Sequence, residues 1–123
     1  MVIGIGIDIV RIDRMKKWIV RPFLMKRYFR DKEIEDAESR GASSAMSLAA
    51  RFAAKEAFGK ALGTGLMGIS LKEIQVENNK NGKPEMILYG NAKTAFERTG
   101  GRNIHVSLTH ETDNAIAVVV IEG

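Results

Sequence analysis

The chain has 123 residues, of which 45% are hydrophobic and 28% are charged, a balance typical of one folded domain and not of a disordered or fibrous chain. It contains no cysteine, which excludes disulfides, thiolate metal sites and thiol catalysis. No apolar run approaches the ~20 residues of a membrane-spanning helix. The first residues also lack the basic stretch and cleavage site of a signal peptide. We therefore expect a cytoplasmic protein without membrane contact.

The formal net charge of +4 is unevenly distributed along the chain. Residues 11–30 carry eight lysines and arginines against a single acid, Asp13, whereas the rest of the chain is net acidic. Such a segment predicts a docking surface for an anionic partner, whether an acidic protein, a phosphate-bearing ligand or a nucleic acid. An ordinary solvated helix face explains the same pattern, so the charge alone leaves both interpretations open.

The chain opens with a predicted β-strand. Its residues alternate, with Ile3, Ile5, Ile7 and Ile9 on one face and Gly4, Gly6 and Asp8 on the other. A period of two residues is typical of a strand. The glycines leave open space on the Asp8 side of this strand, so we expect another group to approach it closely there.

Helices are predicted for most of the next fifty residues. They cover residues 13–20, 23–30, 31–41 and 45–62. Asp13 and Asp31 are expected to act as N-caps of the first and third helices. Ser43 or Ser44 begins the longest helix, and Gly63 follows its end.

The remaining residues predict four strands and one short helix. The strands cover residues 71–77, 85–89, 103–109 and 115–122, and the helix covers residues 91–98. Asn81-Gly82, between the first two of these strands, is the strongest short hairpin signal in the chain. The order βαααββαββ indicates a single α+β domain over residues 1–123, with a largely antiparallel sheet packed against helices.

Glu56, in the longest helix, is the first candidate for chemistry. On a helical wheel it falls in an apolar arc with Leu48 and Phe52, where an unpaired carboxylate is very costly. Lys60, one turn later, would give an ordinary helix ion pair. Alternatively, Glu56 binds a hard cation such as magnesium, with Asp8 as the second carboxylate. The spacing of these residues leaves both interpretations open.

His110, at the end of the predicted strand 103–109, is the second candidate. A hydrogen-bonded structural histidine is the simpler interpretation, although a hairpin exit with neighbouring hydroxyls suits phosphate binding. With two histidines and no cysteine in the chain, a zinc site is not expected.

Five short motifs, taken together, resemble one known family. They are Gly6-Ile7-Asp8, the segment 52–60, Leu62-Gly63-Thr64-Gly65, Asn81-Gly82-Lys83-Pro84 and the segment 106–111. In this order and at this chain length they are similar to 4′-phosphopantetheinyl transferases, above all to the small bacterial holo-[acyl carrier protein] synthase type. The resemblance covers about residues 3 to 122. In one departure, Ala42-Ser43-Ser44-Ala45 stands where the family often has basic residues, so another group must hold whatever those residues hold.

The resemblance implies an activity and a set of site residues. It implies magnesium-dependent transfer of 4′-phosphopantetheine from coenzyme A to a serine of apo-acyl carrier protein, in fatty acid biosynthesis, with release of adenosine 3′,5′-bisphosphate. Asp8 and Glu56 would be the magnesium ligands, and Lys60 would lie along the pyrophosphate. These three would be the catalytic residues. The implied coenzyme-binding residues are Arg51, Lys60, Gly63, Asn81, Gly82, Lys83, Pro84, Thr109 and His110.

The resemblance also implies partners. The acidic carrier protein would dock on the basic segment 11–30, Arg14 and Arg21 especially, because opposite charges steer association. Family members of this type are trimers with active sites between subunits. Residues 115–121 are apolar at every position, so we expect both faces of that strand to be buried. An apolar sheet face left open by the helices would mark such an interface.

Two alternatives to this enzyme come from other classes of protein. A small basic nucleic-acid-binding domain without catalysis fits the positive charge. However, one Trp, two Tyr and five Phe do not form the aromatic-rich strands of RNA-binding sheets. A trimeric binding protein of the same fold without activity is the other alternative, and the joint presence of Asp8, Glu56 and Lys60 argues against it.

Overall fold

The computed structural model describes residues 1–123, and its fold is α+β with antiparallel sheets, as predicted. Its helices and strands are β1 (Val2–Arg11), α1 (Ile12–Trp18), α2 (Pro22–Tyr28), α3 (Asp31–Glu38), α4 (Ser44–Leu62), β2 (Ile74–Asn78), β3 (Pro84–Leu88), α5 (Gly90–Arg98), β4 (Asn103–His110) and β5 (Asn114–Glu122). Two short 3₁₀ helices, η1 (Gly41–Ser43) and η2 (Leu71–Glu73), precede α4 and β2. No helix combines the length and apolar character needed to cross a membrane.

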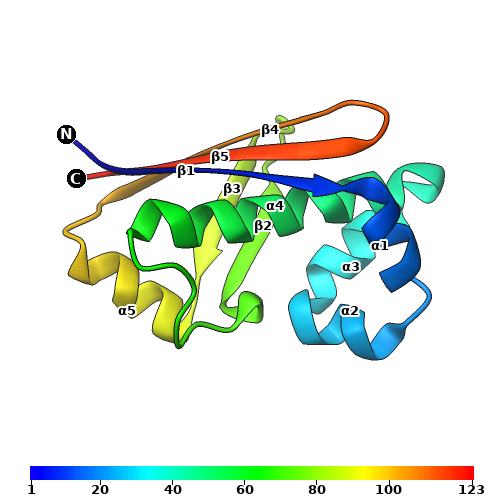
Figure 1. The fold of residues 1–123 in the computed structure, drawn as a ribbon, viewed down its shortest axis with the longest axis horizontal. Coiled ribbons are helices and arrows are strands. Elements are labelled where there is room, and N and C mark those ends of the chain that lie inside the picture. The colour runs from blue at the N-terminus through cyan, green and yellow to red at the C-terminus, as the bar shows by residue number, and fades with distance from the viewer.

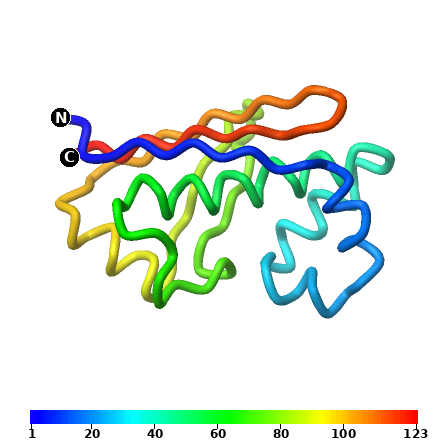
Figure 2. Tube along the Cα trace, in the orientation of Figure 1, coloured from blue at the N-terminus to red at the C-terminus, as the bar shows by residue number.

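Two sheets lie on different sides of α4. The larger is antiparallel with strand order β1-β5-β4, and the smaller is the β2-β3 hairpin. Figure 1 shows the large sheet along one long side of the molecule, with α4 beneath it and α1, α2 and α3 gathered at one end. The two termini lie side by side at the other end (Figure 2), where the Met1 amine donates to the Gly123 carbonyl at 3.0 Å.

Two glycines let α4 pack directly on β1. A Cβ at Gly4 would collide with the carbonyl oxygen of Ala61, and one at Gly6 with that of Ala57. The prediction of a close approach on the Asp8 side of the strand is thus confirmed, and the approaching group is the backbone of α4. Because this contact brings helix and strand together, side chains of α4 can reach those of β1.

The outer face of the large sheet is apolar along β1 and β5 and polar along β4, where His105, Ser107 and Thr109 lie, and α4 covers only the inner face. On β5 the covered face consists of Ala115, Ala117, Val119 and Ile121, all fully buried. On the opposite face the β1 isoleucines are exposed: Ile3 by 40%, Ile5 by 63%, Ile7 by 58% and Ile9 by 59%. The expectation that both faces of residues 115–121 are buried therefore holds for one face within a single chain.

Some local boundaries differ from the predictions. Four α-helices separate β1 from β2, as the four predicted helical ranges indicate, whereas the order βαααββαββ counted only three. Asp13 and Asp31, predicted as N-caps, lie instead in the first turns of α1 and α3. The N-cap of α1 is Arg11, because α1 begins directly where β1 ends, and the N-cap of α3 is Arg30. The predicted strand 71–77 begins only at Ile74, because Glu73 accepts a hydrogen bond from the Ser70 N–H at 2.8 Å and closes η2.

Candidate active site

Asp8, Glu56 and Lys60 come together where β1 contacts α4. Lys60 Nζ donates to Asp8 Oδ1 at 3.0 Å and to the Ile7 carbonyl at 2.9 Å. The Asp8 side chain is 19% exposed and that of Lys60 is 57% exposed, so the pair lies at the surface. The local ion pair considered for Glu56 and Lys60 is not formed, because the lysine reaches across to the strand instead.

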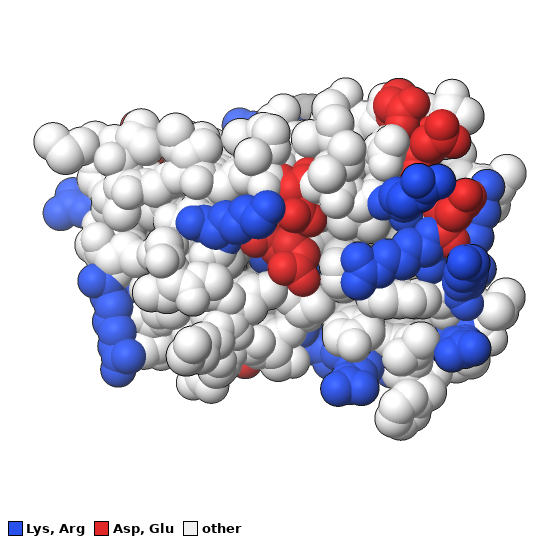
Figure 3. Space-filling view, in the orientation of Figure 1, with Lys and Arg blue, Asp and Glu red and all other residues white.

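Glu56 is half-buried beside this pair. Burial and then the nearby charge of Asp8 raise the pKa of Glu56, and the positive charges of Arg14 and Lys60 oppose that rise. Two carboxylates therefore lie close enough to repel each other at the surface. We call Asp8 and Glu56 the carboxylate pair. Figure 3 shows acidic side chains near the middle of this face with a basic one beside them, and a larger basic group toward the end where α1 lies.

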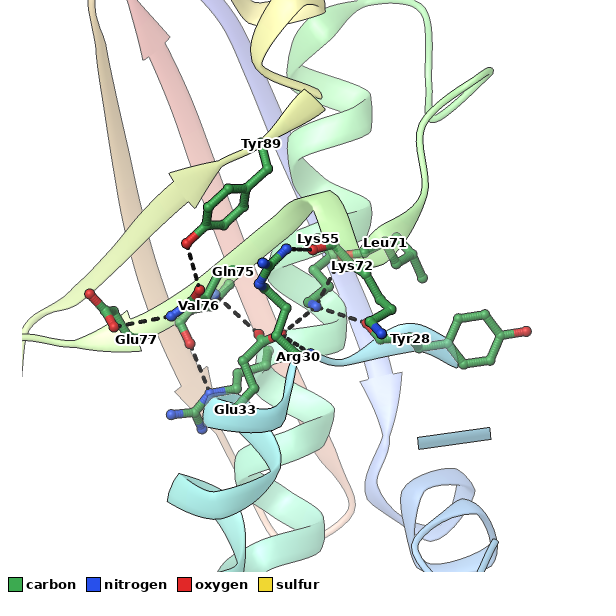
Figure 4. A network of polar contacts seen from close by, with 11 residues as sticks. Tyr28, Arg30, Glu33, Lys55, Leu71, Lys72, Gln75, Val76, Glu77 and Tyr89 are labelled. Atoms are coloured by element: carbon green, nitrogen blue, oxygen red, sulfur yellow. Dashed lines mark hydrogen bonds and ion pairs between the residues drawn. The ribbon is translucent and has the colours of Figure 1, made fainter. Parts of the chain in front are cut away.

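A buried ion pair fixes α4 behind the carboxylate pair. Lys55 Nζ donates to Glu33 Oε1 at 2.7 Å, to the Tyr28 carbonyl at 2.8 Å and to the Leu71 carbonyl at 3.1 Å. Glu33 Oε2 accepts from the Val76 N–H at 3.1 Å. Both charged side chains are fully buried, and burial lowers the pKa of Lys55 to about 8. Figure 4 shows how this network ties the helices before α4, the residues of η2 and strand β2 to α4.

A cleft of about 460 Å³ opens elsewhere, between α4, the β2-β3 hairpin and the edge of β4. Six of the predicted coenzyme-binding residues line it, namely Arg51, Gly82, Lys83, Pro84, Thr109 and His110. The other three lie outside its lining. Lys60 lies beside Asp8, Gly63 ends α4 with a φ of 83°, and Asn81 lies in the hairpin loop. The structure thus brings residues from three distant segments into one cleft.

Arg51 forms one wall of this cleft. Its side chain is 4% exposed, its Nε donates to the Val76 carbonyl at 3.0 Å, and its Nη1 donates to Ser47 Oγ. Its Nη2 is buried and has no hydrogen-bond partner, the carboxylate of Asp36 lying 3.7 Å away. Burial lowers the pKa of Arg51. A buried donor without an acceptor is unusual in a folded protein, which makes this nitrogen a candidate contact for a ligand.

The hairpin that carries Gly82 and Lys83 to the cleft depends on Asn79, which the sequence analysis missed. Its side-chain oxygen accepts from the Asn81 N–H at 2.8 Å and from the Lys83 N–H at 3.0 Å. Gly82 has a φ of +83°, a conformation that favours glycine. The Asn-Gly signal therefore predicted the turn, whereas the asparagine two residues earlier holds it.

The sequence analysis also assigned Arg14 only to docking. Its guanidinium lies 4.7 Å from the centre of the Trp18 ring and 5.0 Å from that of Phe52, one turn before Glu56 on α4. Arg14 therefore connects the basic segment to the carboxylate pair. Trp18, four residues after Arg14, was the only local sequence signal, whereas Phe52 meets Arg14 through the packing of α1 on α4.

The cleft and the carboxylate pair lie at opposite edges of the large sheet. Asp8 on β1 is in register with Ala117 on the central strand β5, and Ala117 is in register with Leu108 on β4, which lines the cleft. Two strand spacings, about 10 Å, therefore separate the two edges, and α4 fills the space beneath. Within one chain, these residues do not line a single cavity.

Comparison with known proteins identifies relatives over the whole chain. A family model described as the 4′-phosphopantetheinyl transferase superfamily matches residues 4–119. The holo-[acyl-carrier-protein] synthase of Treponema denticola is 54% identical over 123 residues, which are 100% of both chains. The crystal structure of the Neisseria meningitidis holo-[acyl-carrier-protein] synthase superposes with a TM-score of 0.86 at 36% identity, covering 100% of both chains. That of the Bacillus anthracis synthase in complex with CoA (3′,5′-ADP) gives a TM-score of 0.80 at 35% identity, covering 98% of this chain and 96% of the other.

Proposed function

The chain belongs to the 4′-phosphopantetheinyl transferase superfamily and is an enzyme of its holo-[acyl-carrier-protein] synthase group, and we propose that it transfers 4′-phosphopantetheine from coenzyme A to a serine of apo-acyl carrier protein. The observation that carries this proposal is the meeting of Asp8, Glu56 and Lys60 at the contact between β1 and α4. A cytoplasmic location and a role in fatty acid biosynthesis are included in the proposal and rest on the family resemblance.

The carboxylate pair fits a magnesium ion. Burial and then the charge of Asp8 raise the pKa of Glu56, so a divalent cation between the two carboxylates would relieve both charges. Two protein carboxylates, completed by waters and phosphate oxygens, are a common way of binding magnesium. Bound there, magnesium would polarise phosphoryl oxygens and offset the charge of the leaving adenosine 3′,5′-bisphosphate.

Lys60 supplies a positive charge at the same place. The serine hydroxyl loses its proton to solvent water, and its oxygen forms a bond to the phosphorus on the pantetheine side. That phosphorus loses its bond to the bridging oxygen, which leaves with adenosine 3′,5′-bisphosphate. This substitution needs mainly alignment of the two reactants and compensation of negative charge. Lys60 is held at Asp8 and Ile7 by its hydrogen bonds and can turn its point charge toward the pyrophosphate.

The cationic cleft suits the adenosine end of coenzyme A. Arg51 offers a buried, unpartnered N–H, Lys83 adds a second charge, and His110 with Thr109 adds hydrogen-bonding groups at the strand end. Its distance from the carboxylate pair across the sheet supports a site shared between subunits. The adenosine end would then bind in the cleft of one subunit and the pyrophosphate at the carboxylate pair of its neighbour.

The exposed isoleucine face supports a homotrimer. Contiguous exposed apolar surface usually marks an interface, and Ile3, Ile5, Ile7 and Ile9 form a continuous row along β1. Three such sheets packed around an axis would cover these rows. The same arrangement would bring the cleft of one subunit toward the carboxylate pair of the next.

The basic segment 11–30 suits the acidic carrier protein. Arg14 and Arg21 are exposed, and Phe23 and Val20 beside them are exposed by 80% and 75%, which offers charged and apolar contacts together. Because Arg14 also lies near Glu56, a carrier bound to α1 would have its serine close to the carboxylate pair. Nucleic-acid binding, the alternative function, explains neither why the basic segment lies beside the carboxylate pair nor why the chain belongs to this family.

The test is direct. The protein is incubated with coenzyme A, magnesium and apo-acyl carrier protein, and the carrier is weighed by mass spectrometry. We expect a mass gain of one 4′-phosphopantetheine, lost on removal of magnesium and in folded Asp8→Asn and Glu56→Gln variants. An unmodified carrier with the wild-type protein would refute the proposed activity, and near-normal turnover in either variant would refute the assigned carboxylates.

A further inference from the structure

The lining of the cleft carries charge of only one sign. Its charged residues are Arg40, Arg51 and Lys83, and no aspartate or glutamate is among the lining residues. Its neutral hydrogen-bonding side chains include Ser47, Asn78 and Thr109. Three cations converging on a cleft without a carboxylate favour an anionic ligand.

One nitrogen of Arg51, a residue of the cleft lining, makes no hydrogen bond within the protein. Its Nε and Nη1 are used within the protein, whereas its Nη2 is buried without an acceptor. The nearest carboxylate, that of Asp36, lies at 3.7 Å and outside the cleft lining. An unmade hydrogen bond at a buried donor is costly, so an anion that reached this nitrogen from the cleft would gain from the contact.

Arg40 is held at the same cleft by the connection between α3 and α4. The Arg40 N–H donates to the Ala37 carbonyl at 3.0 Å, the Ser43 N–H donates to the Arg40 carbonyl at 3.1 Å, and Gly41 turns the chain with a φ of +55°. The Arg40 side chain is exposed and takes part in no ion pair, and its charge lies close enough to Arg51 to lower the pKa of that guanidinium.

The residues between Arg40 and α4 carry no other charge, since they are Gly41, Ala42 and Ser43. Arg40 is thus the one cation that this connection contributes to the cleft. The Asp36 carboxylate lies 3.7 Å from Arg51 Nη2 but outside the cleft lining, so the cleft itself presents two guanidinium groups and no carboxylate, which favours an anion of more than one charge. A phosphate monoester, which approaches two negative charges at neutral pH, meets that requirement.

We propose that Arg40 is a specificity-determining residue that, with Arg51 and Lys83, binds a phosphate monoester at the cleft, and that it makes the chain prefer coenzyme A to its 3′-dephosphorylated form. This inference rests on the proposed function for the identity of the ligand. It adds a residue that the sequence motifs did not mark. Because Arg40 is far along the chain from Lys83, only the fold brings the two charges to one ligand.

Binding of nucleotides to the full chain tests the inference without requiring the transfer reaction. Titration calorimetry would compare adenosine 3′,5′-bisphosphate with adenosine 5′-monophosphate, and coenzyme A with 3′-dephospho-coenzyme A. The variants are Arg40→Gln and, as the matched control, Arg98→Gln, which removes an exposed arginine of α5 outside the cleft. Both variants lose one positive charge.

We expect Arg40→Gln to weaken binding of the bisphosphate and of coenzyme A about ten-fold or more, the size of one charge-assisted hydrogen bond. Binding of the two ligands that lack the 3′-phosphate should change less than about two-fold, and Arg98→Gln should change none of them. Equal weakening of all four ligands, or an unchanged preference for the 3′-phosphate in Arg40→Gln, would overturn the inference. If the preference depended on Arg40 but no carrier protein were modified, the inference would stand and the proposed function would fall.

Discussion

The buried pair of Lys55 and Glu33 offers the sharpest test of what holds α4 in place. Replacing Lys55 by Met removes the charge but keeps most of the side-chain volume. The Glu33 carboxylate would then stay buried with only the N–H groups of Val76 and Arg30 as partners, at 3.1 and 3.0 Å. The carbonyls of Tyr28 and Leu71 would also lose their donor.

The expected cost follows from this geometry. Removing one partner of a fully buried ion pair destabilises a protein by about 3–5 kcal/mol, because it leaves an uncompensated charge. A domain of this size has a total stability of about 5–15 kcal/mol, so the variant should unfold at a much lower urea concentration. The double variant Lys55→Met/Glu33→Leu removes the stranded charge as well, and should cost clearly less than the two single changes together.

Urea unfolding can be followed by the fluorescence of Trp18, the single tryptophan of the chain, which stacks on Tyr28 at 5.1 Å between ring centroids. All variants are compared at one protein concentration, since association would shift the transition. Lys32→Met is the matched control, because its ion pair with Glu77 is exposed by 60% at the lysine and is screened by solvent, so its loss should change stability little. A loss below about 1 kcal/mol in Lys55→Met, or strict additivity in the double variant, would refute the reasoning.

Four further outcomes are expected. The pKa of Lys55 falls from 10.5 to about 8 on folding, so the unfolded chain binds more protons than the folded one between these pH values. The free energy of unfolding of the wild type, measured relative to Lys55→Met in urea titrations, should therefore rise from about pH 8 to 10.5, and a fall would contradict this reasoning. Gly6→Ala should cost about 1–3 kcal/mol or prevent folding, since its Cβ meets the Ala57 carbonyl, and a wild-type urea midpoint would show that α4 can move away. Arg21→Glu should raise the KM for carrier protein, as added salt should, with the KM for coenzyme A unchanged; a larger change in the coenzyme KM would assign Arg21 to the nucleotide site instead. Ile5→Asp, in the exposed row of β1, should reduce the mass seen by light scattering to that of one chain, and a wild type that is itself an active monomer would remove the proposed interface.

Local sequence patterns determined the elements of this fold and the motifs of its site. The two-residue period of residues 3–9 predicted β1, the helical pattern and Gly63 fixed the end of α4, and Asn81-Gly82 predicted the hairpin turn. These features succeed because period, capping and turn geometry depend on neighbours within a few residues. The order of short motifs likewise identified the family before any contact was known.

Only the tertiary structure decided which side chains meet. Lys60 lies one helical turn from Glu56, yet it pairs with Asp8, 52 residues away, because Gly4 and Gly6 let α4 rest directly on β1. Lys55 pairs with Glu33, 22 residues away, because α3 packs on α4. The cleft joins the connection before α4, the hairpin and the end of β4, so Arg40 gains its place beside Arg51 from the packing of these segments. A sequence pattern records which residues share a face of one element, whereas the choice of partner depends on which faces the packed backbone brings together.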